Sequence, residues 1–283
     1  MKFGFVTCVQ LGLSCMEAIY EVGGQLALAV TLPDDKAVGK SGRVYLDEFC
    51  AKHDIPLLKI AHVNDPEVVS AITSAEIDWL FIIGWSQIAG PAVLGAPRLG
   101  VLGMHPTLLP VGRGRAAIPW AILKGLQKTG VTLFKMDHGV DTGPIALQIE
   151  IPIDSATDAT ALYKEVELGH VKIIREVIPR IISGGLTLRA QNDEEATVWP
   201  GRKPADGEID LLGSVHDAHR LIRAVTRPYP GAYFYKDLSK VVVWSASVAN
   251  CGESDTSADS KLLRLEFRDG ALLLQDYQII NEH

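Results

Sequence analysis

The sequence contains few cysteines and no long apolar run. None of its four cysteines belongs to a Cys-x-x-Cys pair, which favours reduced thiols over a disulfide framework. No stretch approaches the roughly 20 apolar residues that a membrane-spanning helix requires. Gln10 also interrupts the apolar N-terminal run too early for a signal peptide. We therefore expect a cytoplasmic protein that has no membrane partner.

Basic charge is in deficit as well. The 283 residues include 27 Lys and Arg against 34 Asp and Glu, for a net charge of −7. A large nucleic-acid footprint requires a basic surface, so nucleic acid is a disfavoured partner, although a local basic patch stays compatible with this charge. The Gly-x-Gly-x-x-Gly phosphate-binding pattern is absent near the N-terminus.

The first half of the chain alternates strand-like and helix-like segments. Strands are expected at residues 3–7, 26–32, 55–60 and 79–83, with helices at 15–21, 44–53 and 67–74 between them. Residues 79–83 are uninterrupted apolar, as is typical of a strand buried on both faces of a parallel sheet. The alternation predicts an α/β fold with a doubly wound, Rossmann-like parallel sheet, whose ligands bind at the carboxyl ends of the strands.

The second half changes character after a polar segment rich in Gly and Pro. Before that segment we expect a helix at 117–124, strands at 131–136 and 146–153, and a long helix at 157–182. After it we expect a helix at 216–227 and strands at 232–235, 240–247, 262–267 and 271–275. The prediction is a catalytic domain over residues 1–190, a linker over 191–205 and a small β-rich C-terminal domain over 206–283.

A histidine and an aspartate stand out in the middle of the chain. His105 follows an apolar strand, and Asp141 lies 36 residues later in an Asp-x-x-x-Asp-x-Gly turn after the next strand. A carboxylate beside an imidazole fixes its tautomer and orientation, or relays protons through a water. On spacing alone, a lone histidine and aspartate of this kind are more often structural than catalytic.

The surrounding motifs resemble the folate-dependent formyltransferase family. They are His-Pro-Thr-Leu-Leu-Pro at 105–110, Arg-Gly at 113–114, Thr-Gly-Val-Thr at 129–132 and Asp-His-Gly-Val-Asp-Thr-Gly at 137–143. Similarity also extends over 81–85 and 223–232, and so over nearly the whole chain. The resemblance implies an enzyme with the formyltransferase fold. The resemblance also implies that the formyl group passes directly from the cosubstrate 10-formyltetrahydrofolate to an amine, without a metal.

The resemblance also implies the site residues. His105 and Asp141 fall on the catalytic pair, and Gly103 falls on the catalytic asparagine. The residues expected to bind the folate are Phe81, Ile83, Gly84, Trp85, Asp137, Gly139 and Val140. Those expected on the acceptor side are Ser86, Gln87, Thr107, Arg113 and Arg115. Ordinary core is the alternative for Ile83 and Trp85, and simple loop solvation is the alternative for the two arginines. His216 and His219 are interpreted as a helix surface rather than metal ligands.

Gly103 is the departure from the family pattern. The family's asparagine donates a hydrogen bond to the formyl oxygen as it gains charge, and losing such a donor costs about 10²–10³ in rate. Three interpretations follow. A surrogate donor replaces it (protonated His105, a backbone N–H near Gly103, Ser86 or Gln87), the enzyme is slow, or the chain keeps only folate binding.

Three features favour a small-molecule acceptor amine over tRNA. They are the acidic composition, the short second domain, and a compact loop at 34–40 in place of a long basic insertion. The predicted acceptor is a nucleotide-linked amino sugar. Formylation of methionyl-tRNA is the second alternative, and a non-catalytic folate-binding protein is the third. A homodimer is compatible with all three.

Overall fold

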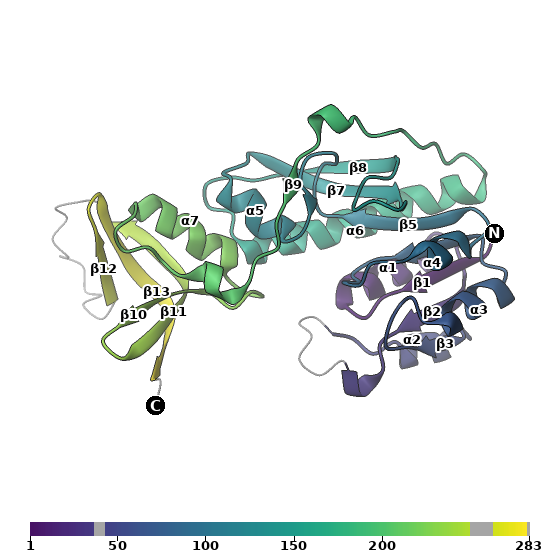
Figure 1. Ribbon diagram of the computed structural model, residues 1–283, viewed down its shortest axis with the longest axis horizontal. Coiled ribbons are helices and arrows are strands. Elements are labelled where there is room, and N and C mark those ends of the chain that lie inside the picture. Colours follow the sequence, from purple (N-terminus) through teal and green to yellow (C-terminus); the bar gives the residue numbers. More distant parts are fainter. Residues whose placement is uncertain (37–42, 250–262, 282–283) are drawn as a thin grey trace. The chain divides into compact units, whose positions relative to one another are not determined.

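The computed structural model describes residues 1–36, 43–249 and 263–281, and Cys251 lies outside them. The chain forms two compact units. The first contains Met1–Gly114, Thr129–Ile151 and Glu165–Val198, and the second contains Arg115–Lys128, Pro152–Lys164 and Trp199–His283 (Figure 1). The second unit thus includes two segments from the first 190 residues. The boundaries at 190/191 and 205/206 stay a prediction.

The first unit is built on a seven-stranded sheet of order β3-β2-β1-β4-β5-β7-β8. The strands are β1 (Phe3–Val6), β2 (Leu26–Thr31), β3 (Leu57–Lys59), β4 (Trp79–Ile82), β5 (Gly100–His105), β7 (Lys128–Lys135) and β8 (Ile145–Pro152). The pairings among β1 to β5 are parallel. The predicted α/β class with a parallel-dominated sheet is confirmed.

Helices connect strands β1 to β5. They are α1 (Gln10–Glu21), α2 (Asp47–Lys52), α3 (Pro66–Ser74) and α4 (Pro91–Gly95). A long helix, α6 (Ala159–Ile182), follows β8. Successive side chains of a strand point to opposite faces of the sheet, and in these strands apolar side chains lie on both faces, as in buried parallel strands. Leu80 and Ile82 of β4 lie in a core cluster with Ile72 of α3. Phe81, between them, packs instead against the rings of Phe3 and Phe5.

The direction of β7 departs from the expected pattern. β7 pairs with β5 antiparallel, with Leu102 opposite Lys135 and His105 opposite Thr132. In an antiparallel pair the two carboxyl ends lie at opposite edges of the sheet. The loops that follow β5 and β7 therefore do not leave from a shared edge, as an all-parallel sheet would require.

The second unit contains an antiparallel sheet of order β10-β11-β13-β12, which confirms the predicted β-rich C-terminal part. Its strands are β10 (Ala232–Lys236), β11 (Ser239–Ala249), β12 (Leu263–Phe267) and β13 (Gly270–Asn281). Helix α7 (Val215–Val225) packs on β11 and β13, and α5 (Ala117–Leu123) packs on α7 (Figure 1). A further two-stranded pairing joins β6 (Arg113–Gly114) and β9 (Val198–Trp199). In the part of the chain that the structure describes, no helix is long and apolar enough to cross a bilayer.

Candidate active site

His105 is the last residue of β5, and its imidazole is largely buried, with 8% of the residue exposed. Its Nε2 lies 2.8 Å from the carbonyl oxygen of Gly112, and its Nδ1 lies 3.5 Å from Oδ2 of Asp141. A carbonyl oxygen only accepts, so Nε2 carries a hydrogen and donates it. Nδ1 is therefore the atom at which His105 gains or loses a proton, and it faces a carboxylate.

Asp141 is held by its own backbone and by a neighbouring loop. Its φ is +56°, in the left-handed region that aspartate tolerates better than most residues. Its Oδ2 accepts a hydrogen bond of 2.9 Å from the backbone N–H of Gly114. A Cβ at Gly143 would lie 1.7 Å from the carbonyl oxygen of Lys135, so the turn that follows Asp141 needs a glycine. This turn brings together the two residues that the sequence separates by 36 positions.

Gly103 lies two residues before His105, and so on the same face of β5. A Cβ built on it would lie 3.1 Å from Cγ and Sδ of Met136 and 3.5 Å from the Phe134 ring. The thioether of Met136 therefore borders the space that a side chain at 103 would enter. The backbone of Gly103 is inside the sheet, paired with Ile82 on one side and Phe134 on the other.

The side chain of Gln87 is hydrogen-bonded to the loop before α3. Its Nε2 donates to the carbonyl oxygen of Ala61 (2.9 Å), and its Oε1 accepts from the backbone N–H of Val63 (2.7 Å) and from Trp85 Nε1 (3.3 Å). The Gln87 side chain and the Gly103 main chain, which lies inside the sheet, are thus both engaged within the fold.

The segment after β4 combines core side chains with an exposed backbone. Phe81 and Ile83 are at most 1% exposed, so their side chains belong to the core, as the alternative for Ile83 stated. Trp85 is partly buried against the core cluster. Gly84 is exposed with a φ of +68°, and a Cβ there would lie 2.4 Å from Val9 Cγ2. Any folate contact by Phe81 or Ile83 must come from the main chain.

The 137–142 turn is exposed and internally bonded. Asp137 Oδ1 accepts hydrogen bonds from the Gly139 N–H (3.0 Å) and from Thr142 Oγ1 (2.6 Å). Val140 is 56% exposed. The turn thus keeps its shape without support from a ligand, and it presents main chain and an apolar side chain beside Asp141.

The residues predicted on the acceptor side have different surroundings. Thr107 is 1% exposed, and its Oγ1 is buried without a partner among the described residues. Arg113 is buried, and its guanidinium bonds Gln191 Oε1 and Asp193 rather than solvent. Arg115 belongs to the second unit, where its backbone N–H donates to the Trp199 carbonyl.

Sequence reasoning missed several polar residues that support the site. The Thr132 hydroxyl donates to the Thr107 carbonyl (2.7 Å) and accepts from the Leu109 N–H (3.1 Å) and from Gln148 Nε2 (2.8 Å). His170 of α6 is 2% exposed; burial lowers the pKa of its imidazole to about 4, and the nearby His105 acts in the same direction. The Thr-Gly-Val-Thr motif and a histidine in the apolar period of a long helix were the available signals.

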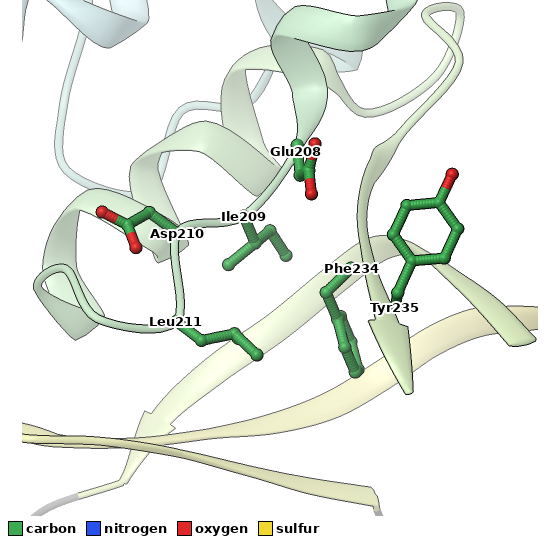
Figure 2. A pocket seen from close by; sticks show the side chains of 6 residues that line it. All are labelled: Glu208, Ile209, Asp210, Leu211, Phe234 and Tyr235. Carbon is green, nitrogen blue, oxygen red and sulfur yellow. The ribbon is translucent and has the colours of Figure 1, made fainter. Parts of the chain in front are cut away.

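A cavity of about 450 Å³ lies in the second unit, and none of the residues that line it is a predicted site residue. Figure 2 shows its lining residues: Glu208, Ile209, Asp210, Leu211, Phe234 and Tyr235. Two carboxylates and a phenol make this lining unsuited to a phosphate-bearing ligand. Among the residues that the structure describes, no group of three or more His, Cys, Asp or Glu is arranged to hold a metal ion.

Comparison with known proteins covers most of the chain. The Formyl transferase family matches residues 19–178, and the Formyl transferase C-terminal domain family matches residues 202–282. The methionyl-tRNA formyltransferase of Clostridioides difficile is 30% identical, over 100% of this chain and 93% of that protein.

Two solved structures share the fold at lower identity. The N-formyltransferase from Helicobacter canadensis, in complex with folinic acid and dTDP-3-aminofucose, aligns with a TM-score of 0.71 at 17% identity, over 97% of this chain and 99% of that one. Methionyl-tRNA formyltransferase from Clostridium thermocellum aligns with a TM-score of 0.64 at 19% identity, over 100% of both chains.

Proposed function

Because the chain belongs to the formyltransferase family, we propose that it transfers the formyl group of 10-formyltetrahydrofolate to the amine of a nucleotide-linked amino sugar. The observation that supports catalysis is the approach of His105 Nδ1 to Asp141 Oδ2 at 3.5 Å. A folate donor is supported by the folinic acid in the Helicobacter canadensis complex. The exposed main chain at Gly84 and at the 137–142 turn is suited to backbone recognition of that donor.

The proposed reaction forms one C–N bond and breaks another. The neutral amine attacks the formyl carbon, a tetrahedral oxyanion forms, and tetrahydrofolate leaves. The proton lost by the amine is taken up at Nδ1 of His105, since Nε2 already donates to Gly112, and Asp141 stabilises the imidazolium that results. The same proton is then available for the leaving nitrogen, through a water beside Asp141.

Charge supports a small acceptor. Residues 199–283 contain 10 Lys and Arg against 12 Asp and Glu, so the C-terminal part carries no basic excess. A protein that binds tRNA through such a domain gains affinity from each phosphate it neutralises. The dTDP-3-aminofucose in the Helicobacter canadensis complex indicates the chemistry of the proposed acceptor.

Formylation of methionyl-tRNA is the second candidate. The Clostridioides difficile relative carries that name, and it supports this alternative through similarity along the whole chain. The compact loop at 34–40 is one of the features that disfavour tRNA as the acceptor. Only its first three residues, up to Lys36, belong to the described part of the chain, which continues from Arg43. The third alternative, a non-catalytic folate-binding protein, rests on Gly103 alone.

A turnover assay separates the three candidates. The purified protein is incubated with 10-formyltetrahydrofolate and either dTDP-linked 3- and 4-amino sugars or methionyl-tRNA, and tetrahydrofolate release is followed. We expect release with an amino sugar and none above background with the tRNA. Turnover with methionyl-tRNA alone would refute the proposed acceptor. No turnover with either, together with tight binding of 5-formyltetrahydrofolate, would favour the non-catalytic protein.

A further inference from the structure

The segment at residues 189–198, which the sequence assigns largely to a linker, is bonded to both loops of the candidate active site. The carbonyl oxygen of Thr197 accepts a hydrogen bond from the backbone N–H of Arg113 (2.9 Å), and its Oγ1 accepts one from the backbone N–H of Gly112 (2.9 Å). The N–H of Thr197 donates to the carbonyl oxygen of Pro110 (3.2 Å). Arg189 forms a two-way backbone bridge with Ile145 at the start of β8. The segment therefore connects the loop after His105 to the turn that contains Asp141.

Gln191 makes the contacts nearest to Asp141. Its Nε2 donates to the carbonyl oxygens of Asp141 (2.8 Å) and Gly143 (2.7 Å). Its Oε1 accepts from Nε (3.1 Å) and Nη2 (2.8 Å) of Arg113. Both N–H groups and the oxygen of the amide are thus in use, which is the full capacity expected of a partly buried glutamine.

Arg113 determines which way the Gln191 amide faces. A guanidinium has donors only, so the amide oxygen must point at Arg113, and the NH2 group must then point at the two carbonyls. Arg113 is itself 7% exposed and paired with Asp193 through an Nη2–Oδ1 distance of 2.6 Å. This pairing makes Arg113 a fixed donor rather than a free cation for an anionic substrate.

The two carbonyls that Gln191 holds are that of Asp141 itself, whose backbone is left-handed, and that of Gly143 two residues later. With these carbonyls held, the backbone of Asp141 is held as well, and from it the side chain reaches the Gly114 N–H and His105 Nδ1. We propose that Gln191, oriented by Arg113, is a positioning residue that aligns Asp141 with His105. The proposal rests on the roles given to these two residues under Proposed function.

Three variants of the full chain test this role. Gln191→Leu removes both sets of contacts at similar volume. Gln191→Glu keeps an oxygen partner for Arg113 but replaces the NH2 group by an acceptor that faces two carbonyls. Asn192→Ala is the matched control, because Asn192 bonds only Glu194 and Glu195 of its own turn in the described contacts. Each variant is also made in the Asp141→Asn background.

Tetrahydrofolate release is measured at saturating 10-formyltetrahydrofolate, with the dTDP-amino sugars and with methionyl-tRNA, so that either acceptor serves. We expect kcat about tenfold lower in both Gln191 variants, KM for the donor within twofold of the parent, and Asn192→Ala unchanged. In the Asp141→Asn background the Gln191 variants should cause no further loss, since the residue they position is already disabled.

Two results would overturn the positioning role of Gln191 while leaving the proposed function intact. One is a parent-like kcat in Gln191→Glu, and the other is a tenfold loss that persists in the Asp141→Asn background. Thermal unfolding of each variant shows whether it is folded at the assay temperature, and an unfolded Gln191→Leu leaves Gln191→Glu to decide. If Asp141→Asn alone keeps parent activity, the catalytic assignment is wrong, and the positioning role is refuted together with it.

Discussion

The site loops of the first unit and the sheet of the second unit use polar side chains in different ways. Around His105, the side chains of Thr132, Gln148 and Gln191 are buried or partly buried, and each bonds to main-chain atoms of the loops. In the second unit, described ion pairs such as Arg220–Asp217 are exposed. Exposed pairs contribute little to stability, whereas buried networks fix geometry. The polar side chains around His105 therefore fix the site loops in the first unit, whereas the ion pair of the second unit lies at the surface.

The largest expected effect is on catalysis. Asp141→Asn should leave the fold intact, because asparagine accepts the Gly114 N–H and tolerates a positive φ. It removes the charge that faces Nδ1, so activity should fall by about 10² or more, as should that of His105→Ala. Asp237→Asn is the control, since Asp237 is an exposed aspartate of the second unit with nearly the same φ of +54°. Formyl transfer at the parent rate in Asp141→Asn would contradict the assignment.

The second effect is on stability. Thr132→Val keeps the shape of a buried side chain but leaves the Leu109 N–H and one N–H of the Gln148 amide without their acceptor. Unsatisfied buried groups of this kind should lower the free energy of unfolding by about 2–3 kcal/mol. Arg220→Ala in the second unit, which removes the exposed pair with Asp217, should cost less than about 1 kcal/mol. Equal losses in urea unfolding would remove the contrast between the two units.

A third effect depends on pH. The folded pKa of His170 is depressed to about 4 from the ordinary value of 6.5, so below pH 6.5 the unfolded chain binds a proton that the folded chain does not. Stability should therefore fall as pH drops from about 6.5 toward 4, by about 2 kcal/mol between pH 7 and pH 5 from this residue. His170→Gln should remove that part of the slope, whereas His216→Gln, at an exposed position, should keep it. Identical slopes in all three proteins would rule out this account.

The smallest effect is expected at Gly103. Gly103→Asn requires Met136 to move by a few tenths of an ångström. We predict that a surrogate donor serves the oxyanion, so turnover should be no faster than that of the parent. Gly103→Asn combined with Met136→Ala tests crowding, since it opens the space beside the new amide. A tenfold gain in the single variant, about 1.4 kcal/mol of transition-state stabilisation, would show that no surrogate exists.

Local pattern was sufficient for most of the fold. The apolar runs at 26–32 and 79–83 correspond to β2 and β4, and the alternating pieces after residue 232 correspond to the antiparallel sheet. These elements follow from periodicity, which each segment carries by itself. The motif around His105 likewise indicated the residues that the structure brings within 3.5 Å of each other.

Contacts between distant segments were decided only by the tertiary structure. No local pattern predicts that β7 runs antiparallel to β5, because strand direction depends on the path of the connection rather than on the strand. Nor does a glutamine at position 191, in a polar segment typical of a linker, reveal the carbonyls of Asp141 and Gly143 as its partners. The sequence by itself therefore determined the elements and the reactive side chains. Folding decided their alignment, because hydrogen bonds between loops depend on which buried groups the packed chain brings together.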